Sequence, residues 1–265
     1  MKLLFEKSAF YIFLALVGMS LLSFFWTPFT QEWIELSSEY ALPSTLHWFG
    51  QGENGIDVFS HVMIGLKNSF VLSISVNFLS ATIGAGIGIG SVLLGKFWDE
   101  VLSRLVDVFN AFPSLIIFMC VMAFWGNGFL HLFFALSVTG WASYARVLRS
   151  LALSTTKEPF VEAAVASGAS SFRVLFAHIL PQLYPVFFVQ IFLGLRRVIF
   201  AEAALSFLGL GQSPETASLG RLIAQGKEAL LVAPHLLFIP GVILFLLMFC
   251  ILVLGDKVQR LWVGA

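Results

Sequence analysis

The sequence has few charged residues. Only 15 of its 265 residues are basic and 15 acidic, which is 11% in total, whereas soluble domains carry about a quarter. Hydrophobic residues make up 58% of the chain, with 29 Phe and 7 Trp, and the mean hydropathy is +0.92. A globular core cannot shelter so much apolar surface from water. The composition therefore predicts an integral membrane protein.

An excess of charge of one sign is also missing, because the formal net charge is zero. A nucleic-acid-binding protein would carry a basic patch or stripe, so nucleic acid is excluded as a partner. Cysteine is scarce, and both Cys120 and Cys250 lie inside apolar runs, where free cysteines pack as small hydrophobic residues. Zinc-ligand spacings and hydrolase motifs are absent from the sequence. The sequence thus indicates neither an enzyme nor a protein with a bound metal or other cofactor.

One segment partly matches the sequence pattern of a phosphate-binding loop. Residues 90–97 follow its glycine and lysine spacing until Phe97, which replaces the Ser or Thr that would bind Mg²⁺. The segment also ends an apolar run instead of joining a strand to a helix. We interpret Lys96 as a membrane-surface anchor, so any ATP-driven step must draw its energy from a separate subunit.

Long apolar runs set the expected architecture. A membrane helix needs about 20 mainly apolar residues, and six such runs occur, at residues 9–26, 70–94, 105–125, 129–148, 183–205 and 236–254. The first run could be a signal peptide, but residues 26–28 are a poor cleavage site, so we interpret it as a retained anchor helix. The sequence predicts an all-α integral membrane protein with six transmembrane helices.

Positive residues predict the orientation, because they are retained in the cytoplasm. With the N-terminus inside, the inner side receives ten of them, namely Lys2, Lys7, Lys96, Arg104, Arg146, Arg149, Lys157, Arg173, Lys257 and Arg260. The outer side receives only Lys67, Arg221 and Lys227. We therefore expect both termini in the cytoplasm, with segments 27–69 and 206–235 outside and segment 155–181 inside.

Glycines in the second run predict close helix packing. Gly84 and Gly88, and likewise Gly86 and Gly90, are four residues apart. This spacing lets two membrane helices approach closely.

The segment 155–181 carries the most informative pattern. A short helix is expected to begin near Glu158 and Pro159, since proline suits the first turn of a helix and carboxylates suit its positive end. Gly168 could end this helix. Its small alanine face suits docking into a groove on another protein, although an ordinary amphipathic loop helix is equally compatible with the pattern.

Here the sequence resembles the membrane-spanning permease subunits of ABC importers. Their cytoplasmic "EAA" loop has Glu-Ala-Ala, then Gly, then Leu-Pro at the spacing found in this chain. The resemblance implies that a short cytoplasmic coupling helix lies between spans four and five and meets the ATPase. Its ATPase-coupling residues would be Glu162, Ala163, Ala164 and Gly168.

Further motifs point to the dipeptide, oligopeptide and nickel branch of this family. They are His178-Ile-Leu-Pro181, Arg104-Leu-Val-Asp107, Phe112-Pro-Ser-Leu115, Gly140 to Arg146, and Ala201 to Gly211. The resemblance covers residues 46–259. One departure is the segment 50–57, where only Gly50, Gly55 and Asp57 match the usual pattern.

Ionisable residues inside the predicted spans are the sharpest anomaly. Each Arg at a helix centre opposes insertion by about 2.5–3.5 kcal/mol, and such residues face protein, water or a partner. Arg196 and Arg197 are adjacent in the fifth run. One of them could line the translocation pathway and bind a substrate carboxylate, or they could pair internally with Glu202 or Asp107 or contact a second permease. We take Arg196, Arg197, Glu202 and Asp107 as candidate pathway residues, although pairing with Arg104 or Arg146 is the simpler role for Asp107.

The expected function is that of a permease subunit of an ATP-driven importer for peptides or a related small solute such as a nickel chelate. The resemblance implies a homologous permease subunit, cytoplasmic ATP-binding subunits and an external substrate-binding protein as partners. It also implies a bacterial or archaeal cytoplasmic membrane. Residues 1–69 would form an anchor helix and external loop, and residues 70–265 a five-helix permease core. An ATP-independent secondary transporter or channel is the alternative.

Overall fold

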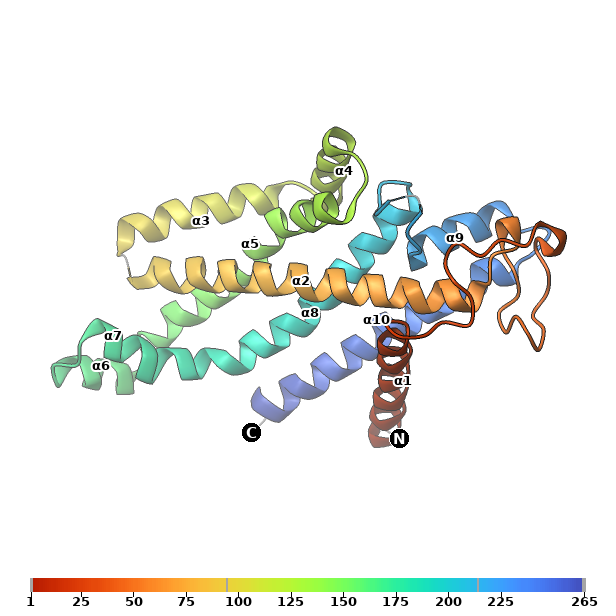
Figure 1. The fold of residues 1–265 in the computed structure, drawn as a ribbon. Helices are drawn as coiled ribbons and strands as arrows, with labels where there is room; N and C mark the ends of the chain where they lie inside the picture. The colour runs from red at the N-terminus through yellow and green to blue at the C-terminus, as the bar shows by residue number, and fades with distance from the viewer. Residues whose placement is uncertain (1, 94, 214, 264–265) are drawn as a thin grey trace.

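The computed structural model describes residues 2–93, 95–213 and 215–263. These residues form helices and loops and contain no β-strand (Figure 1). The longer helices, in chain order, are α1 (Lys2–Leu22), α2 (Val58–Leu93), α3 (Lys96–Ala111), α4 (Ser114–Trp125), α5 (Phe129–Thr155), α6 (Pro159–Ala166), α8 (Leu180–Phe207), α9 (Leu219–Glu228) and α10 (His235–Val263). The short α7 (Ser171–Arg173) and a π-helical turn, η3 (Val174–Ile179), lead directly into α8. The all-α prediction is confirmed for the described residues.

Three continuous helical segments are long and apolar enough to cross a membrane, namely Val58–Val92, Ser171–Phe207 and His235–Leu261. The pair α3 and α4 would add a fourth crossing if the two helices act as one bent span. α1 and α5 fall outside this set. α5 carries hydroxyl groups and two arginines among its apolar residues, which lower its hydropathy.

The third apolar run, 105–125, does not form the continuous helix that we predicted. α3 ends at Ala111, α4 begins at Ser114, and their axes differ by 80°. The cause is local, because Pro113 disfavours the helical conformation of the residue before it. Phe112 is accordingly extended, with φ −95° and ψ 141°.

Two helices begin earlier than the apolar runs indicated. α2 begins at Val58, so the last part of the expected external loop is helical and α2 continues across the predicted boundary at residues 69 and 70. The segment Ser171–Phe207 begins well before residue 183. The first turns of these helices contain polar residues, so their hydropathy does not indicate where the helices begin.

The centre of the molecule is the packing of α2 against α5. A Cβ atom at Gly84 would lie 2.5 Å from the Trp141 carbonyl oxygen, and one at Gly88 would lie 2.5 Å from the Ala145 carbonyl oxygen. Only glycine permits this approach. A Cβ at Gly86 or Gly90 meets nothing within 4 Å, so the packing prediction is confirmed for the first pair of glycines and not for the second.

The long helices run between two ends of the molecule (Figure 1). α6 and α7 lie at one end, shown at the left, while α9 and the loop before α2 lie at the other, shown at the right. The ends of the chain are linked, because Arg260 Nη2 on α10 lies 2.8 Å from Glu6 Oε1 on α1. Segments that are distant in sequence thus lie at the same end of the bundle, as α9 and the loop before α2 do (Figure 1).

Candidate functional site

The helix α6 begins and ends where its sequence predicts. Glu158 precedes it with extended backbone, and Pro159 occupies the first turn, where its missing N–H costs no hydrogen bond. Beyond its last turn, Gly168 has φ +82°, a left-handed conformation that glycine adopts without strain. The predicted short helix in this segment is therefore confirmed.

One side of α6 is anchored and the other is exposed. Val161 is 2% exposed and belongs to an apolar cluster with residues of α5, η3 and α8, including Leu148, Ile179 and Leu183. The predicted coupling residues lie on the open side: Glu162, Ala163 and Gly168 are exposed, and Ala164 is partly exposed. A force applied to α6 would therefore reach α5 and α8 through packed side chains.

The Leu-Pro end of the motif shapes the start of α8. Pro181 cannot donate a backbone hydrogen bond, and its ring would clash with the carbonyl four residues earlier in a regular helix. The chain instead widens into the π-helical turn η3 just before it. This turn keeps α7 and α8 in one continuous segment while joining α6 to the bundle.

Three helices meet at a polar junction midway along the bundle. The Tyr144 hydroxyl on α5 donates to Asn77 Oδ1 on α2. Asn77 Nδ2 donates to the Ile191 carbonyl oxygen on α8 at 3.0 Å. Both side chains are buried. Sequence reasoning missed this junction, because a single Asn and a single Tyr 67 residues apart form no motif.

Arg197 lies in an open pocket of about 230 Å³ formed by α3, α4, α5 and α8. Its Nη1 donates to Ser143 Oγ at 2.6 Å. The lining residues are Phe109, Asn110, Phe112, Ser114, Phe118, Leu136, Thr139, Gly140, Ser143, Arg197, Val198 and Ala201. The break between α3 and α4 forms part of the wall, so the departure from a straight third span helps to create this pocket, whose lining is mainly apolar.

The other candidate pathway residues do not share that pocket. Arg196 has no side-chain hydrogen bond or ion pair within the described parts of the chain. Asp107 accepts from Arg146 Nη2 at 3.1 Å, and both side chains are largely exposed. This pairing is the simpler of the two roles expected for Asp107.

Glu202 is 1% exposed and lies between α2 and α8. It accepts from Ser69 Oγ at 2.8 Å and from Ser206 Oγ at 3.0 Å. A buried carboxylate is costly unless hydrogen bonds satisfy it. The serines supply those bonds, and they place Glu202 as a link between the two helices rather than beside Arg197.

The loop before α2 is folded around a buried carboxylate. Asp57 Oδ1 lies 2.9 Å from His47 Nδ1, and Asp57 Oδ2 accepts from Ser60 Oγ at 2.6 Å. Gly50 and Gly55 have positive φ values of +78° and +73°. In segment 50–57, Gly50 and Gly55 therefore form turns of this loop, and Asp57 holds the loop together through its hydrogen bonds.

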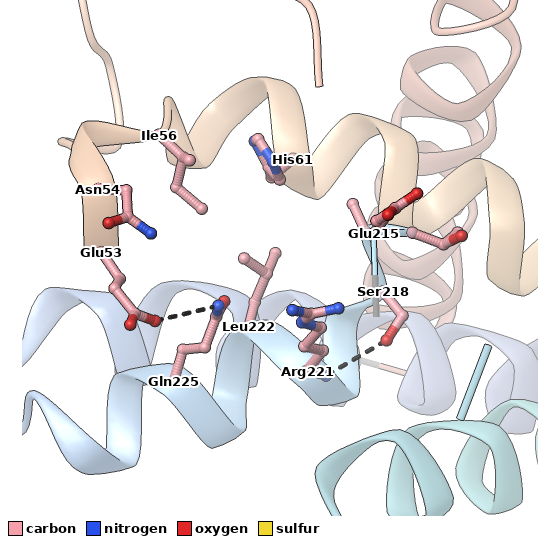
Figure 2. Close-up of a pocket in the computed structure, with 11 residues that line it drawn as sticks. Glu53, Asn54, Ile56, His61, Glu215, Ser218, Arg221, Leu222 and Gln225 are labelled. Carbon is pink, nitrogen blue, oxygen red and sulfur yellow. Dashed lines mark hydrogen bonds between the residues drawn. The ribbon is translucent and has the colours of Figure 1, made fainter. Parts of the chain in front are cut away.

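Next to this loop lies a hollow of about 140 Å³ between α2 and α9 (Figure 2). Figure 2 shows His61 of α2 above Arg221 and Leu222 of α9. Gln225 Nε2 donates to Glu53 Oε2 at 3.5 Å, and Ser218 Oγ accepts from the Arg221 backbone N–H at 3.2 Å. Among the described residues, no group of three or more His, Cys, Asp or Glu side chains could hold a metal ion.

Comparisons with known proteins agree with these features. Residues 80–262 match the family described as "Binding-protein-dependent transport system inner membrane component". The glutathione transport system permease protein GsiD of Salmonella typhimurium strain LT2 is 32% identical over 247 residues, which cover 93% of this chain and 82% of that relative. The GsiD protein of Escherichia coli O157:H7 is 31% identical over 217 residues, covering 82% of this chain and 72% of the relative.

Solved structures share the fold. The inward-facing MetNI methionine ABC transporter gives a TM-score of 0.62 at 19% identity, covering 76% of this chain and 96% of that chain. An amino acid ABC transporter crystallised with histidines gives 0.54 at 20% identity, covering 72% and 90%. Likeness at this level of identity establishes a common helical architecture.

Proposed function

Because this chain belongs to the family of binding-protein-dependent transport system inner membrane components, and is the permease subunit of an ABC importer in the peptide branch, we propose a role for each of three of its regions. α6 is the coupling helix that receives the motion of a separate cytoplasmic ATPase. The pocket beside Arg197 belongs to the translocation pathway. The opposite end, with α9 and the loop before α2, faces the external substrate-binding protein.

The observation that carries this proposal is the two-sided character of α6. Val161 is buried in the bundle, while Glu162 and Ala163 are free to meet a partner. Beside them, Phe160 and Val165 are also exposed apolar residues, and exposed apolar patches mark interaction sites. Gly168 lets the chain turn away from the docked helix. Closure of the ATPase would then push α5 and α8 and open the pathway alternately to each side.

Six crossings are proposed, formed by α1, α2, α3 with α4, α5, the segment Ser171–Phe207, and α10. α6 then lies between the fourth and fifth crossings. The ion pair of Arg260 with Glu6 and the excess of positive residues near α6 support a cytoplasmic location for both termini. Residues 1–69 form the proposed anchor and external region, and residues 70–265 the permease core.

The proposed cargo is a peptide. The relatives named above are glutathione transport permeases, and an Arg197 guanidinium suits a carboxylate, which it can bind through two parallel hydrogen bonds. The complete importer would further contain a homologous permease. Family membership favours this ATP-driven function over an ATP-independent transporter or channel.

Charge reversal on α6 tests the proposal. In the complete importer reconstituted in proteoliposomes, Glu162→Arg should abolish uptake and separate ATP hydrolysis from transport, while the chain still inserts and assembles. Glu100→Arg is the matched control, because Glu100 is also an exposed carboxylate, on α3. Normal uptake by the Glu162→Arg importer, or equal loss in the control, would count against α6 as the coupling helix.

A further inference from the structure

A second cavity, of about 430 Å³, lies at the α9 end of the molecule. Ligand pockets in proteins typically enclose about 300–1,000 Å³. Residues from the end of α8, the following loop and α9 line it, together with Asn127: they are Ser206, Phe207, Leu208, Gly209, Gly211, Gln212, Ser213, Thr216, Ser218, Arg221, Ala224 and Glu228. Arg221 also lines the neighbouring hollow of Figure 2, so its side chain lies between the two spaces.

Two hydrogen-bond donors of this cavity lack acceptors. Gln212 is 9% exposed, and its Nε2 has no hydrogen-bond partner among the described residues. Arg221 forms no side-chain hydrogen bond or ion pair within the same residues, since the nearby Glu53 accepts from Gln225 instead. Buried polar groups are nearly always hydrogen-bonded, so the free Gln212 amide requires an explanation. The Arg221 side chain is partly exposed and is open to a ligand. A ligand carrying acceptor oxygens would satisfy both donors.

The remaining polar groups of the cavity are mostly committed elsewhere. Ser206 Oγ donates to Glu202, Ser218 Oγ accepts from the backbone N–H of Arg221, and Asn127 Nδ2 donates to the Gly209 carbonyl oxygen at 3.0 Å. Beside the cavity, α9 packs closely on α8, because a Cβ at Gly220 would lie 2.1 Å from the Ala203 carbonyl oxygen. The cavity therefore presents Arg221 and Gln212 to a ligand as nitrogen donors, together with the hydroxyl groups of Ser213 and Thr216.

A carboxylate is present at the other side of the cavity. Glu228 lies seven residues after Arg221 on the same helix, so the two share a face and are separated by about 10 Å along the axis. Glu228 forms no ion pair within the described residues. An extended chain spans about 3.3–3.6 Å per residue, and about three residues would thus bridge the two charges.

We propose that this cavity is an outer receiving site for a short zwitterionic peptide, whose C-terminal carboxylate binds Arg221 and Gln212 and whose ammonium group faces Glu228. The site deepens the proposed function and rests on it, since it names the residues that first receive the peptide cargo and the charged ends that they recognise. It is separate from the pocket beside Arg197. Between the two lies an apolar cluster that includes the fully buried side chains of Leu132 and Leu205.

Direct binding without the substrate-binding protein tests this site. The complex of this chain with its partner permease and ATPase is placed in nanodiscs, and three labelled probes are compared: trialanine, trialanine amide and N-acetyl-trialanine. The wild-type complex should bind free trialanine about tenfold more tightly than either blocked peptide, since each block removes one charge-assisted interaction.

Three variants assign the two ends of the peptide. Arg221→Ala should abolish the preference for the acid over the amide, and Gln212→Leu should weaken it. Glu228→Gln should abolish only the preference for the free over the acetylated N-terminus. Lys67→Ala is the control, because it removes another cation near this end, one whose Nζ lies over the Phe24 ring and outside the cavity lining.

The stimulation of ATP hydrolysis by the substrate-binding protein is measured on every variant. It verifies that the variant is folded, and it separates a failure of the receiving site from a failure of the proposed permease function. The receiving site is overturned if the binding protein stimulates hydrolysis but the wild-type complex does not prefer trialanine to trialanine amide. It is also overturned if that preference survives Arg221→Ala. Both results leave the proposed function intact. Loss of binding-protein affinity in Arg221→Ala with unchanged trialanine binding also overturns the receiving site. Absence of stimulated hydrolysis in the wild-type complex would count against the proposed function itself.

Discussion

The Tyr144 hydroxyl donates a hydrogen bond to the Asn77 amide oxygen where α2, α5 and α8 meet. Directly opposite these two side chains, α8 has Gly194. A Cβ atom there would lie 2.1 Å from both Asn77 Oδ1 and the Tyr144 hydroxyl oxygen. The absence of one methyl group on α8 therefore allows the polar junction between α2 and α5 to form.

Gly194→Ala should consequently destabilise the bundle. The added methyl group cannot be accommodated without moving α8 or breaking the Tyr144 hydrogen bond, and overpacking of this kind costs about 1–3 kcal/mol or more. Thermal unfolding of the purified importer measures the effect as a lower apparent Tm. Gly86→Ala is the matched control, since its Cβ meets nothing within 4 Å. An unchanged Tm for Gly194→Ala would contradict the close packing.

Asp99→Asn should loosen α3 from α5. Arg149 makes two parallel hydrogen bonds to Asp99, of 2.5 Å from Nε and 2.6 Å from Nη2, and both side chains are partly buried. Losing one charge of such a pair should lower the free energy of unfolding by about 1–3 kcal/mol. The control is Asp107→Asn, which removes the exposed pair between the same two helices and should cost less than about 1 kcal/mol. Equal effects in denaturation experiments would argue against a special role of the Asp99 pair.

Aspartate substitutions on the two sides of α6 should have opposite consequences. Val161→Asp places an unpaired charge inside an apolar cluster, which should cost at least about 3 kcal/mol and prevent accumulation of folded protein. Val165→Asp lies on a side chain that is 57% exposed, so the chain should fold normally but lose its ATPase during copurification. Retention of the ATPase by folded Val165→Asp protein would contradict docking through this surface.

Arg197→Ala should reduce transport more than Arg196→Ala. Of the two arginines, only Arg197 lines the pocket between α3, α4, α5 and α8, where it contacts Ser143. Loss of one charge-assisted interaction with cargo corresponds to about a tenfold drop in uptake, with assembly unchanged. Initial uptake rates in proteoliposomes compare the two variants, and equal rates for both would remove Arg197 from the proposed pathway. Arg197→Lys should recover part of the activity, because it restores the charge without the planar fork.

Much of the fold was predictable because its causes are local. The apolar excess requires a membrane environment whatever the tertiary arrangement. Pro159 and Gly168 begin and end α6 through their own backbone preferences. Pro113 also acts locally, and the break before α4 could have been expected from Phe112-Pro113 alone, but the continuous apolar character of 105–125 concealed it.

The sequence by itself determined the membrane character, the family and the position of α6, the proposed coupling helix, since composition, caps and motif spacing act within a few residues. Only the tertiary structure decided which of two adjacent arginines lines a pocket, which glycines are in contact, and that Gln212 Nε2 has no hydrogen-bond partner among the described residues. Successive helical residues point about 100° apart, and neighbouring helices alone determine which direction is occupied. Contacts such as that between Asn77 and Tyr144 join distant segments, and local preference carries no information about them.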